Sequence, residues 1–137
     1  MTAKYCLDTA IWRDLHEDRK DRYKDLGELA LALFLKIRLN QGKILYSDLV
    51  IDELSRAYDK KIIKNLFKNV SDVLVKAEIN EKQVKEAANL SQNLKIPFGD
   101  ALHGVVARDN RAVLVTRDRH FKKLGDQIVI IKPEDLS

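Results

Sequence analysis

Five short runs of consecutive apolar residues recur along this 137-residue chain. None of them alternates apolar with polar side chains, and continuous apolar runs are typical of strands buried on both faces of a parallel sheet. The runs are Tyr5–Leu7, Ile44–Tyr46, Val73–Val75, Ala112–Val115 and Ile128–Ile131. The stretches between them repeat apolar residues at helical spacing, as in Leu26, Leu33 and Ile37. Strands that alternate with helices predict an α/β fold, a three-layer sandwich with right-handed crossovers around a parallel sheet.

Length and composition predict one globular domain over residues 1–137, because 45% of the residues are hydrophobic and 34% are charged. The single cysteine, Cys6, has no partner for an internal disulfide, which favours a reducing compartment. The longest apolar segment, Leu29–Leu35, is far shorter than the ~20 residues of a membrane-spanning helix. We therefore expect a cytoplasmic protein with no membrane contact. The net charge of +4 is only a modest attraction for a polyanion.

Four acidic residues stand where ligands of a parallel sheet bind. Asp8 follows the first predicted strand, and Asp118 follows the fourth through Thr116-Arg117. Glu53 lies in the helix after the second strand, and Asp100 opens the helix that leads into the fourth. Ligands of open parallel sheets bind outside the carboxyl ends of the strands. In a doubly wound sheet these four acids therefore meet at one edge.

Grouped carboxylates repel one another, which raises their pKa values unless a cation neutralises them. Mg²⁺ and Mn²⁺ prefer such oxygen ligands, and either ion can activate water and stabilise the leaving oxygen in phosphodiester cleavage. No cysteines and histidines stand at zinc-finger spacing. The acids therefore predict a Mg or Mn site that cleaves a phosphodiester.

Each acid also has a purely structural interpretation. Asp8 is a good helix N-cap residue, and Asp100 is a favourable charge in a first helical turn. Asp118 stands beside two arginines with which it can form an ion pair, and Glu53 follows another acid on a surface helix. What favours a metal site is that all four stand at the expected ends of strands.

Four segments carry a resemblance to a known family. They are "YCLDTAIW" at residues 5–12, "SDLVIDEL" at 47–54, "FGDALHGVVA" at 98–107 and "LVTRDRHF" at 114–121. In this order and spacing the chain resembles the PIN domain, and more particularly the small VapC-like ribonucleases of bacteria and archaea. The resemblance spans nearly the whole chain. It implies a sheet of about five strands in the order 3-2-1-4-5 and a metal-dependent endoribonuclease, either the toxin of a toxin–antitoxin pair or an RNA-processing enzyme.

Residue by residue, the resemblance implies four metal-binding and catalytic acids, which are Asp8, Glu53, Asp100 and Asp118. Thr116 matches the Ser/Thr that supports the fourth acid. Thr9 occupies a position beside the first acid where a hydroxyl residue is common.

The chain departs from the family pattern at two positions. Ala10 stands where many relatives have Asn, and His120 stands where many have a further Asp before Phe121. The missing fifth acid argues against a strong second metal site, but not against the first. For His120 both a structural role and a contact with a phosphate stay open. His103, three residues after Asp100, lies on the same helical face within reach of the acids.

Residues near the acids are candidates for binding the substrate. Cationic side chains there would contact the phosphates of RNA without recognising its bases. The candidate substrate-binding residues are Thr9, Arg13, Arg117 and Arg119.

Leu31, Leu35 and Leu39 form a second apolar row on their predicted helix. A surface helix needs only one such row, so the second indicates either deeper burial or contact with another chain. The resemblance implies a homodimer and an antitoxin protein as partners.

Two other functions compete with the nuclease. A receiver-like phospho-acceptor domain matches Asp8, Thr116 and Lys132-Pro133, but it requires an acceptor Asp after the third strand and leaves Asp100 and Asp118 without a role. A catalytically silent, RNA-binding PIN module is the second competitor, and the four intact acids argue against it.

Overall fold

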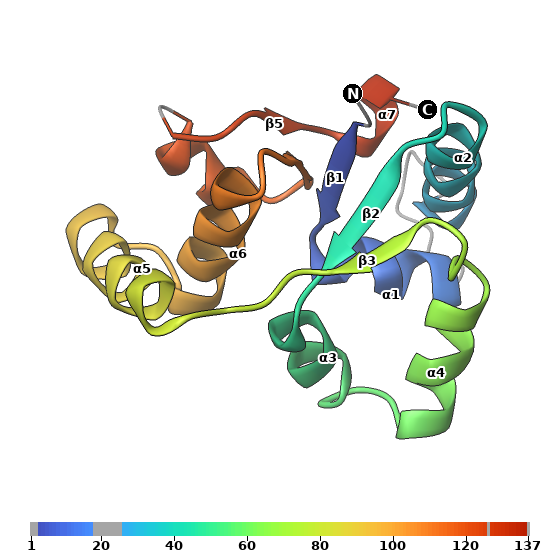
Figure 1. Ribbon diagram of the computed structural model, residues 1–137, viewed down its shortest axis with the longest axis horizontal. Helices are drawn as coiled ribbons and strands as arrows, with labels where there is room; N and C mark the ends of the chain where they lie inside the picture. The colour runs from blue at the N-terminus through green and yellow to red at the C-terminus, as the bar shows by residue number, and fades with distance from the viewer. Residues whose placement is uncertain (1–2, 18–25, 126, 137) are drawn as a thin grey trace.

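The five apolar runs form one parallel sheet in the order β3-β2-β1-β4-β5, as expected. The structure is a computed structural model that describes residues 3–17, 26–125 and 127–136. The strands are β1 (Lys4–Leu7), β2 (Lys43–Tyr46), β3 (Leu74–Lys76), β4 (Val113–Val115) and β5 (Ile130–Ile131). After β3, at one edge, the chain crosses back to place β4 beside β1 (Figure 1). The strand order therefore changes direction between β1 and β4, which is where doubly wound sheets bind ligands.

Helices cover both faces of the sheet (Figure 1). Alternate residues of each central strand enter two separate cores, as the period of two of a strand requires. The helices are α1 (Thr9–Glu17), α2 (Leu26–Leu39), α3 (Asp48–Leu54), α4 (Lys60–Lys68), α5 (Glu81–Leu94), α6 (Phe98–Asp109) and α7 (Pro133–Leu136). Cys6 of β1 belongs to the core beneath α5 and α6, whereas its neighbour Leu7 belongs to the core beneath α1 and α2. This is the expected three-layer α/β sandwich.

Local sequence explains where the helix that carries Asp100 begins. Helix α5 ends at Leu94, and its C-cap residue, Lys95, adopts the left-handed conformation with φ of 55°. Pro97 then precedes the first residue of α6, and a proline at this point cannot continue the preceding helix. Asp100 consequently lies in the first turn of α6, where a negative charge is favourable.

The outer strands differ from the expected burial. Val75 of β3 is 41% exposed, and both residues of β5 are only partly buried. An apolar run shows that a strand is hydrophobic, but not whether a second strand covers each of its edges. The sequence patterns also did not predict the short helix α7 or the 3₁₀ helix η1 (Arg119–Leu124). Among the described residues, no helix has the length and apolar character needed to span a bilayer.

Candidate active site

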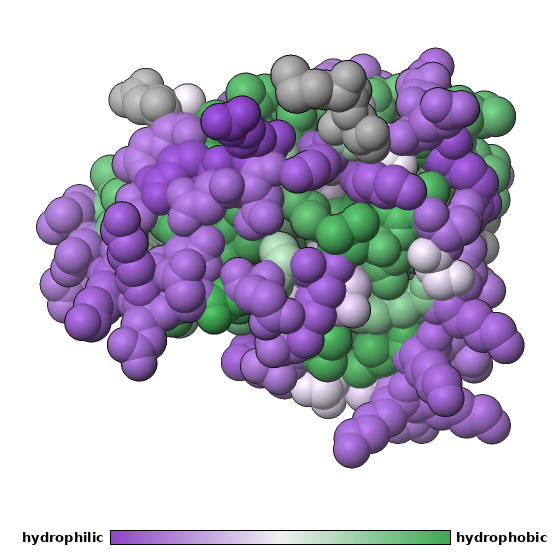
Figure 2. Space-filling model, viewed as in Figure 1, coloured by the Kyte–Doolittle hydropathy of each residue, from purple (hydrophilic) through white to green (hydrophobic). Residues whose placement is uncertain are grey.

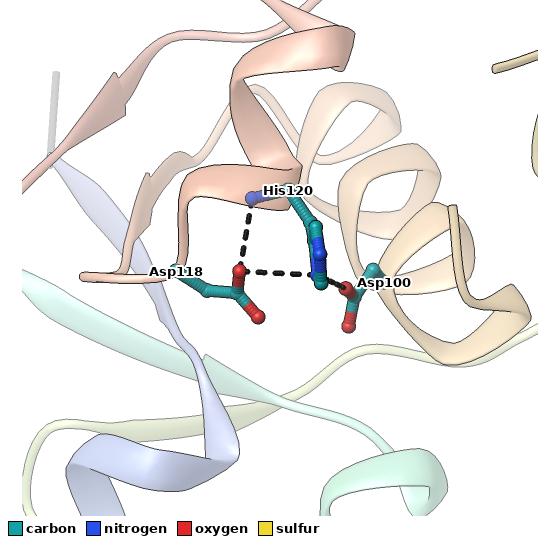
Figure 3. Close-up of side chains that lie close together, drawn as sticks. All are labelled: Asp100, Asp118 and His120. Carbon is teal, nitrogen blue, oxygen red and sulfur yellow. Dashed lines mark hydrogen bonds and ion pairs between the residues drawn. The ribbon is translucent and has the colours of Figure 1, made fainter. Parts of the chain in front are cut away.

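Three carboxylates come together where the carboxyl ends of β1 and β4 lie side by side. Leu7 pairs with Val115 across these strands, and the N–H of Asp8 donates to the Val115 carbonyl at 3.0 Å. Asp8 therefore follows β1 directly beside the segment that carries Asp118. The first turn of α6 brings Asp100 to the same place, and Figure 3 shows Asp100 and Asp118 directed into one space with His120.

Thr116 joins the two strand ends. Its hydroxyl donates to Asp8 Oδ2 at 2.9 Å and accepts from the backbone N–H of Asp118 at 3.0 Å. The residue is buried, so these bonds compete little with water. One threonine thus orients the Asp8 carboxylate and fixes the start of the Asp118 turn.

Glu53 is held from behind by two side chains. The Thr9 hydroxyl donates to Glu53 Oε1 at 2.7 Å, and His103 Nε2 lies 2.6 Å from the same oxygen. The other oxygen, Oε2, faces α6 at Gly99, where a Cβ atom would stand only 3.3 Å from it. The missing side chain at Gly99 therefore lets the carboxylate approach the start of α6.

The electrostatics of the cluster are those of crowded anions. Burial raises the pKa of Asp100 to about 6, with further repulsion from Asp118 and Asp8. Burial also raises the pKa of Asp8, and repulsion from Glu53 and Asp118 adds to this rise against the opposing effects of His103 and Thr116. In the absence of a cation, ionising these carboxyl groups therefore lowers the free energy of unfolding of the protein.

His103 supplies the one buried positive charge of the described cluster. Its complete burial acts to lower its pKa, but hydrogen bonds with the Cys6 thiol and the Glu53 carboxylate outweigh burial and raise it. Burial likewise acts to raise the pKa of Glu53, but the bonds from His103 and Thr9 hold it below its usual value. Glu53 is therefore ionised in an ion pair with His103. Asp8 and Asp100 differ from it, because burial and mutual repulsion raise their pKa values.

Two clefts meet at Asp118. One, of about 720 Å³, runs between the segment after β4, η1 and β5, and its lining includes the exposed cations Arg119, Lys122 and Lys132. The other, of about 290 Å³, is lined by Asp8, by the start of α1 and also by Asp118. Asp118 thus lies at the junction of the two clefts, and the larger cleft is lined by the acids Glu134 and Asp135 as well as by these cations.

The structure brings together Asp8, Asp100, Asp118 and Thr116, with Glu53 close enough to Asp8 to repel it. The candidate substrate-binding residues lie in different settings. Thr9 is buried against Glu53, and Arg13 lies on α1 with Glu17 as its ion-pair partner. Arg117 bridges Asp14 and Glu134, whereas Arg119 is exposed in the larger cleft.

Sequence reasoning missed the contacts of His103 and Gly99 with Glu53. The spacing of three residues placed His103 on the face of Asp100, but its partner lies 50 residues away in the chain. Nothing in the local pattern marked Gly99 as a point of close approach. A contact between residues that lie far apart in the same chain has no signal in a single sequence.

The donor set fits a hard divalent cation. The described cluster offers carboxylate oxygens from three separate elements, and their mutual repulsion is what a bound cation relieves. One oxygen each of Asp100 and Asp118 and one nitrogen of His120 all lie within 4.8 Å of one another. The residues present are therefore compatible with a Mg or Mn ion.

A parallel five-strand sheet in this order, with helices on both faces, is the PIN-like α/β fold. The family model of the PIN domain matches residues 5–127, and the chain belongs to this family of nuclease type. No curated protein sequence matches the chain.

Solved structures with the same fold include toxin–antitoxin complexes. VapBC2 from Rickettsia felis, bound to a DNA fragment from its promoter, is 21% identical with a TM-score of 0.64, covering 94% of this chain and 98% of that chain. VapBC-1 from nontypeable Haemophilus influenzae is 18% identical with a TM-score of 0.67, covering 96% and 98%. PAE2754 from Pyrobaculum aerophilum is 21% identical with a TM-score of 0.60, covering 99% and 95%. At these identities the similarity establishes the fold.

Proposed function

We propose that this protein is a metal-dependent endoribonuclease, and the toxin of a toxin–antitoxin pair. The observation that carries the proposal is the meeting of Asp8, Asp100 and Asp118 at the carboxyl ends of β1 and β4, where burial and repulsion raise the pKa values of Asp8 and Asp100. Membership of the PIN domain family supports nuclease chemistry at this place. In this proposal residues 1–137 form one PIN-like domain that acts in the cytoplasm.

Asp8, Asp100 and Asp118 would hold Mg or Mn, with Glu53 at the side of the site. When bound, the ion would activate a water molecule and stabilise the leaving oxygen of the phosphodiester. Thr116 orients the Asp8 carboxylate, because its hydroxyl donates a hydrogen bond to Oδ2 and leaves Oδ1 available for the ion. Thr9 and His103 keep Glu53 ionised and in place.

We propose that single-stranded RNA crosses the site from the larger cleft. Its exposed cations, Arg119, Lys122 and Lys132, are suited to phosphate groups, and they outnumber the two acids at its C-terminal end, Glu134 and Asp135. The apolar residues of β5 also line this cleft and are suited to contact with bases. Asp118 lines both clefts and Asp8 lines the smaller one, so a strand that occupies them passes beside these two carboxylates. Arg117 acts differently in this arrangement, because its guanidinium is already paired with Asp14 and Glu134.

We propose two protein partners, an antitoxin and a second copy of this chain. The row Leu31, Leu35 and Leu39 is 51%, 46% and 80% exposed, so the alternative of deeper burial does not apply. Figure 2 shows hydrophobic atoms at the edge of the molecule over α2. Solved structures of this fold include complexes of toxin with antitoxin, which supports an antitoxin as one partner.

The test of the nuclease is a cleavage assay on labelled single-stranded RNA with Mn²⁺, with Mg²⁺ and with a chelator. We expect the wild type to cleave RNA only when a metal ion is present. The rate of cleavage should fall at least about a hundredfold in Asp8→Asn and Asp100→Asn, because each substitution removes a proposed ligand of the ion that activates the water. Asp52→Asn is the matched control, because Asp52 is an exposed carboxylate next to Glu53 in the chain.

Three results would refute the proposal. Equal cleavage by the wild type and both site variants would mean that a contaminating nuclease acts. RNA binding without cleavage under any metal would identify a silent RNA-binding module. Phosphorylation of Asp8 by acetyl phosphate would identify a receiver-like domain.

A further inference from the structure

His120 occupies a fixed position beside the carboxylates. It is the second residue of η1, whose residue Phe121 is fully buried, and its backbone N–H donates to Asp118 Oδ1 at 2.9 Å. The ring extends from η1 toward Asp100 (Figure 3). The backbone of η1 therefore directs an imidazole into the space between two acids of the site.

The distances around this imidazole suit a shared ion. His120 Nδ1 lies 3.3 Å from Asp118 Oδ1 and 3.7 Å from Asp100 Oδ2. Adjacent ligand atoms of an octahedral ion with bonds of about 2.1 Å stand about 3 Å apart. His120 Nδ1 is thus already close to this spacing from each oxygen, and all three donor atoms lie within 4.8 Å of one another, so side-chain adjustment can bring them around one ion.

The surroundings of His120 differ from those of the other two histidines of the chain. His103 is buried, with Nε2 directed at Glu53, and His16 of α1 packs edge-to-face against Tyr58. The His120 side chain is 58% exposed, which leaves room for an ion and its water ligands. Of the three, His120 alone presents a ring nitrogen to both Asp100 and Asp118.

We propose that His120 is a metal ligand through Nδ1, which adds an imidazole to the proposed carboxylate site beside Asp100 and Asp118 and makes the site select Mn²⁺ over Mg²⁺. This inference rests on the proposed metal-dependent function. The selectivity follows from ligand chemistry, because an imidazole nitrogen binds transition-metal ions better than Mg²⁺, which prefers oxygen ligands and retains its waters.

The experiment is binding of Mn²⁺ to the purified full chain, followed by electron paramagnetic resonance. Loss of the signal of free Mn²⁺ gives the affinity, competition with Mg²⁺ gives the selectivity, and electron spin echo modulation detects ¹⁴N coupled to the bound ion. We expect ¹⁴N coupling in the wild type and in the control His16→Ala, and none in His120→Asp. The ratio of Mn²⁺ to Mg²⁺ affinity is expected to fall about tenfold in His120→Asp.

The outcomes separate this inference from the proposed function. If the wild type binds Mn²⁺ without ¹⁴N coupling, or if the coupling persists in His120→Asp, His120 is not a ligand and the inference is wrong while the metal site stands. If the wild type binds no Mn²⁺, both are wrong. The wild-type spectrum alone can refute the inference, so the test does not depend on the folding of a variant.

Discussion

Replacing Asp100 by Asn should stabilise the protein when no metal is bound. The Asp100 side chain is 17% exposed, and burial together with Asp118 and Asp8 raises its pKa to about 6. An asparagine has nearly the same size but carries no charge to desolvate or repel. The variant therefore lacks the unfavourable free energy of desolvation and repulsion that destabilises the wild type at neutral pH.

The size of the effect follows from the pKa. A rise from 3.8 to about 6 corresponds to about 3 kcal/mol at pH 7.5, at 1.36 kcal/mol per pKa unit. Solvent screens a partly exposed group, so we reduce this figure by about half, to 1–2 kcal/mol. For a chain of this length, that is an increase of about 3–6 °C in Tm.

The upward direction of the Asp100 pKa shift also determines how the stability of the protein depends on pH. Because the folded-state pKa of Asp100 is raised, the folded protein holds this proton between pH 3.8 and about 6 while the unfolded chain releases it. The stability contributed by the protonated group is therefore complete below pH 3.8 and is lost as the pH rises through about 6. The advantage of Asp100→Asn should be largest at pH 7.5 and roughly half as large at pH 5.

The assay is urea unfolding in a chelator at pH 5 and 7.5, repeated with Mn²⁺. Added metal should stabilise the wild type by about 2.7 kcal/mol at a hundred times its Kd, and the variant by less. Asp52→Asn serves as the control for removing an exposed charge. A variant less stable than the wild type at pH 7.5 without metal, or an advantage independent of pH, would refute the reasoning.

Two further predictions concern the residues that hold the acids. Gly99→Ala places a Cβ 3.3 Å from Glu53 Oε2, so RNA cleavage should slow by about tenfold. The free energy of unfolding should stay equal or rise by up to about 1 kcal/mol, because alanine forms helices better than glycine. An unchanged rate of cleavage in this variant would contradict the prediction. Thr116→Val removes the hydroxyl that bonds Asp8 and the Asp118 N–H, so unfolding in urea should show a loss of about 1–3 kcal/mol together with slower cleavage. Thr116→Ser should restore both, and a serine variant as impaired as the valine one would show that the hydroxyl is not the cause.

The strands and the positions of the acids could be predicted from the sequence. Strands buried in a parallel sheet are marked by local apolar runs, and Asp8 and Asp118 follow such runs directly. The edge position of β3 could not be predicted this way, because it depends on how many strands lie beyond it. The exposure of Leu31, Leu35 and Leu39 likewise depends on whether another element covers α2.

The sequence by itself determined the chemistry available, which is four carboxylates at strand ends, a threonine near the fourth and no cysteine–histidine cluster at zinc-finger spacing. The resemblance to the PIN domain also implied the strand order that brings the acids to one edge, whereas only the tertiary structure decided which atoms of these groups make contact. Thr116 reaches Asp8 across 108 residues and His103 reaches Glu53 across 50, because the sheet places β4 beside β1 and packs α6 against both. Strand order is a property of the packed sheet, since each run is equally apolar wherever it lies, and the repulsion that calls for a cation exists only after the sheet has assembled.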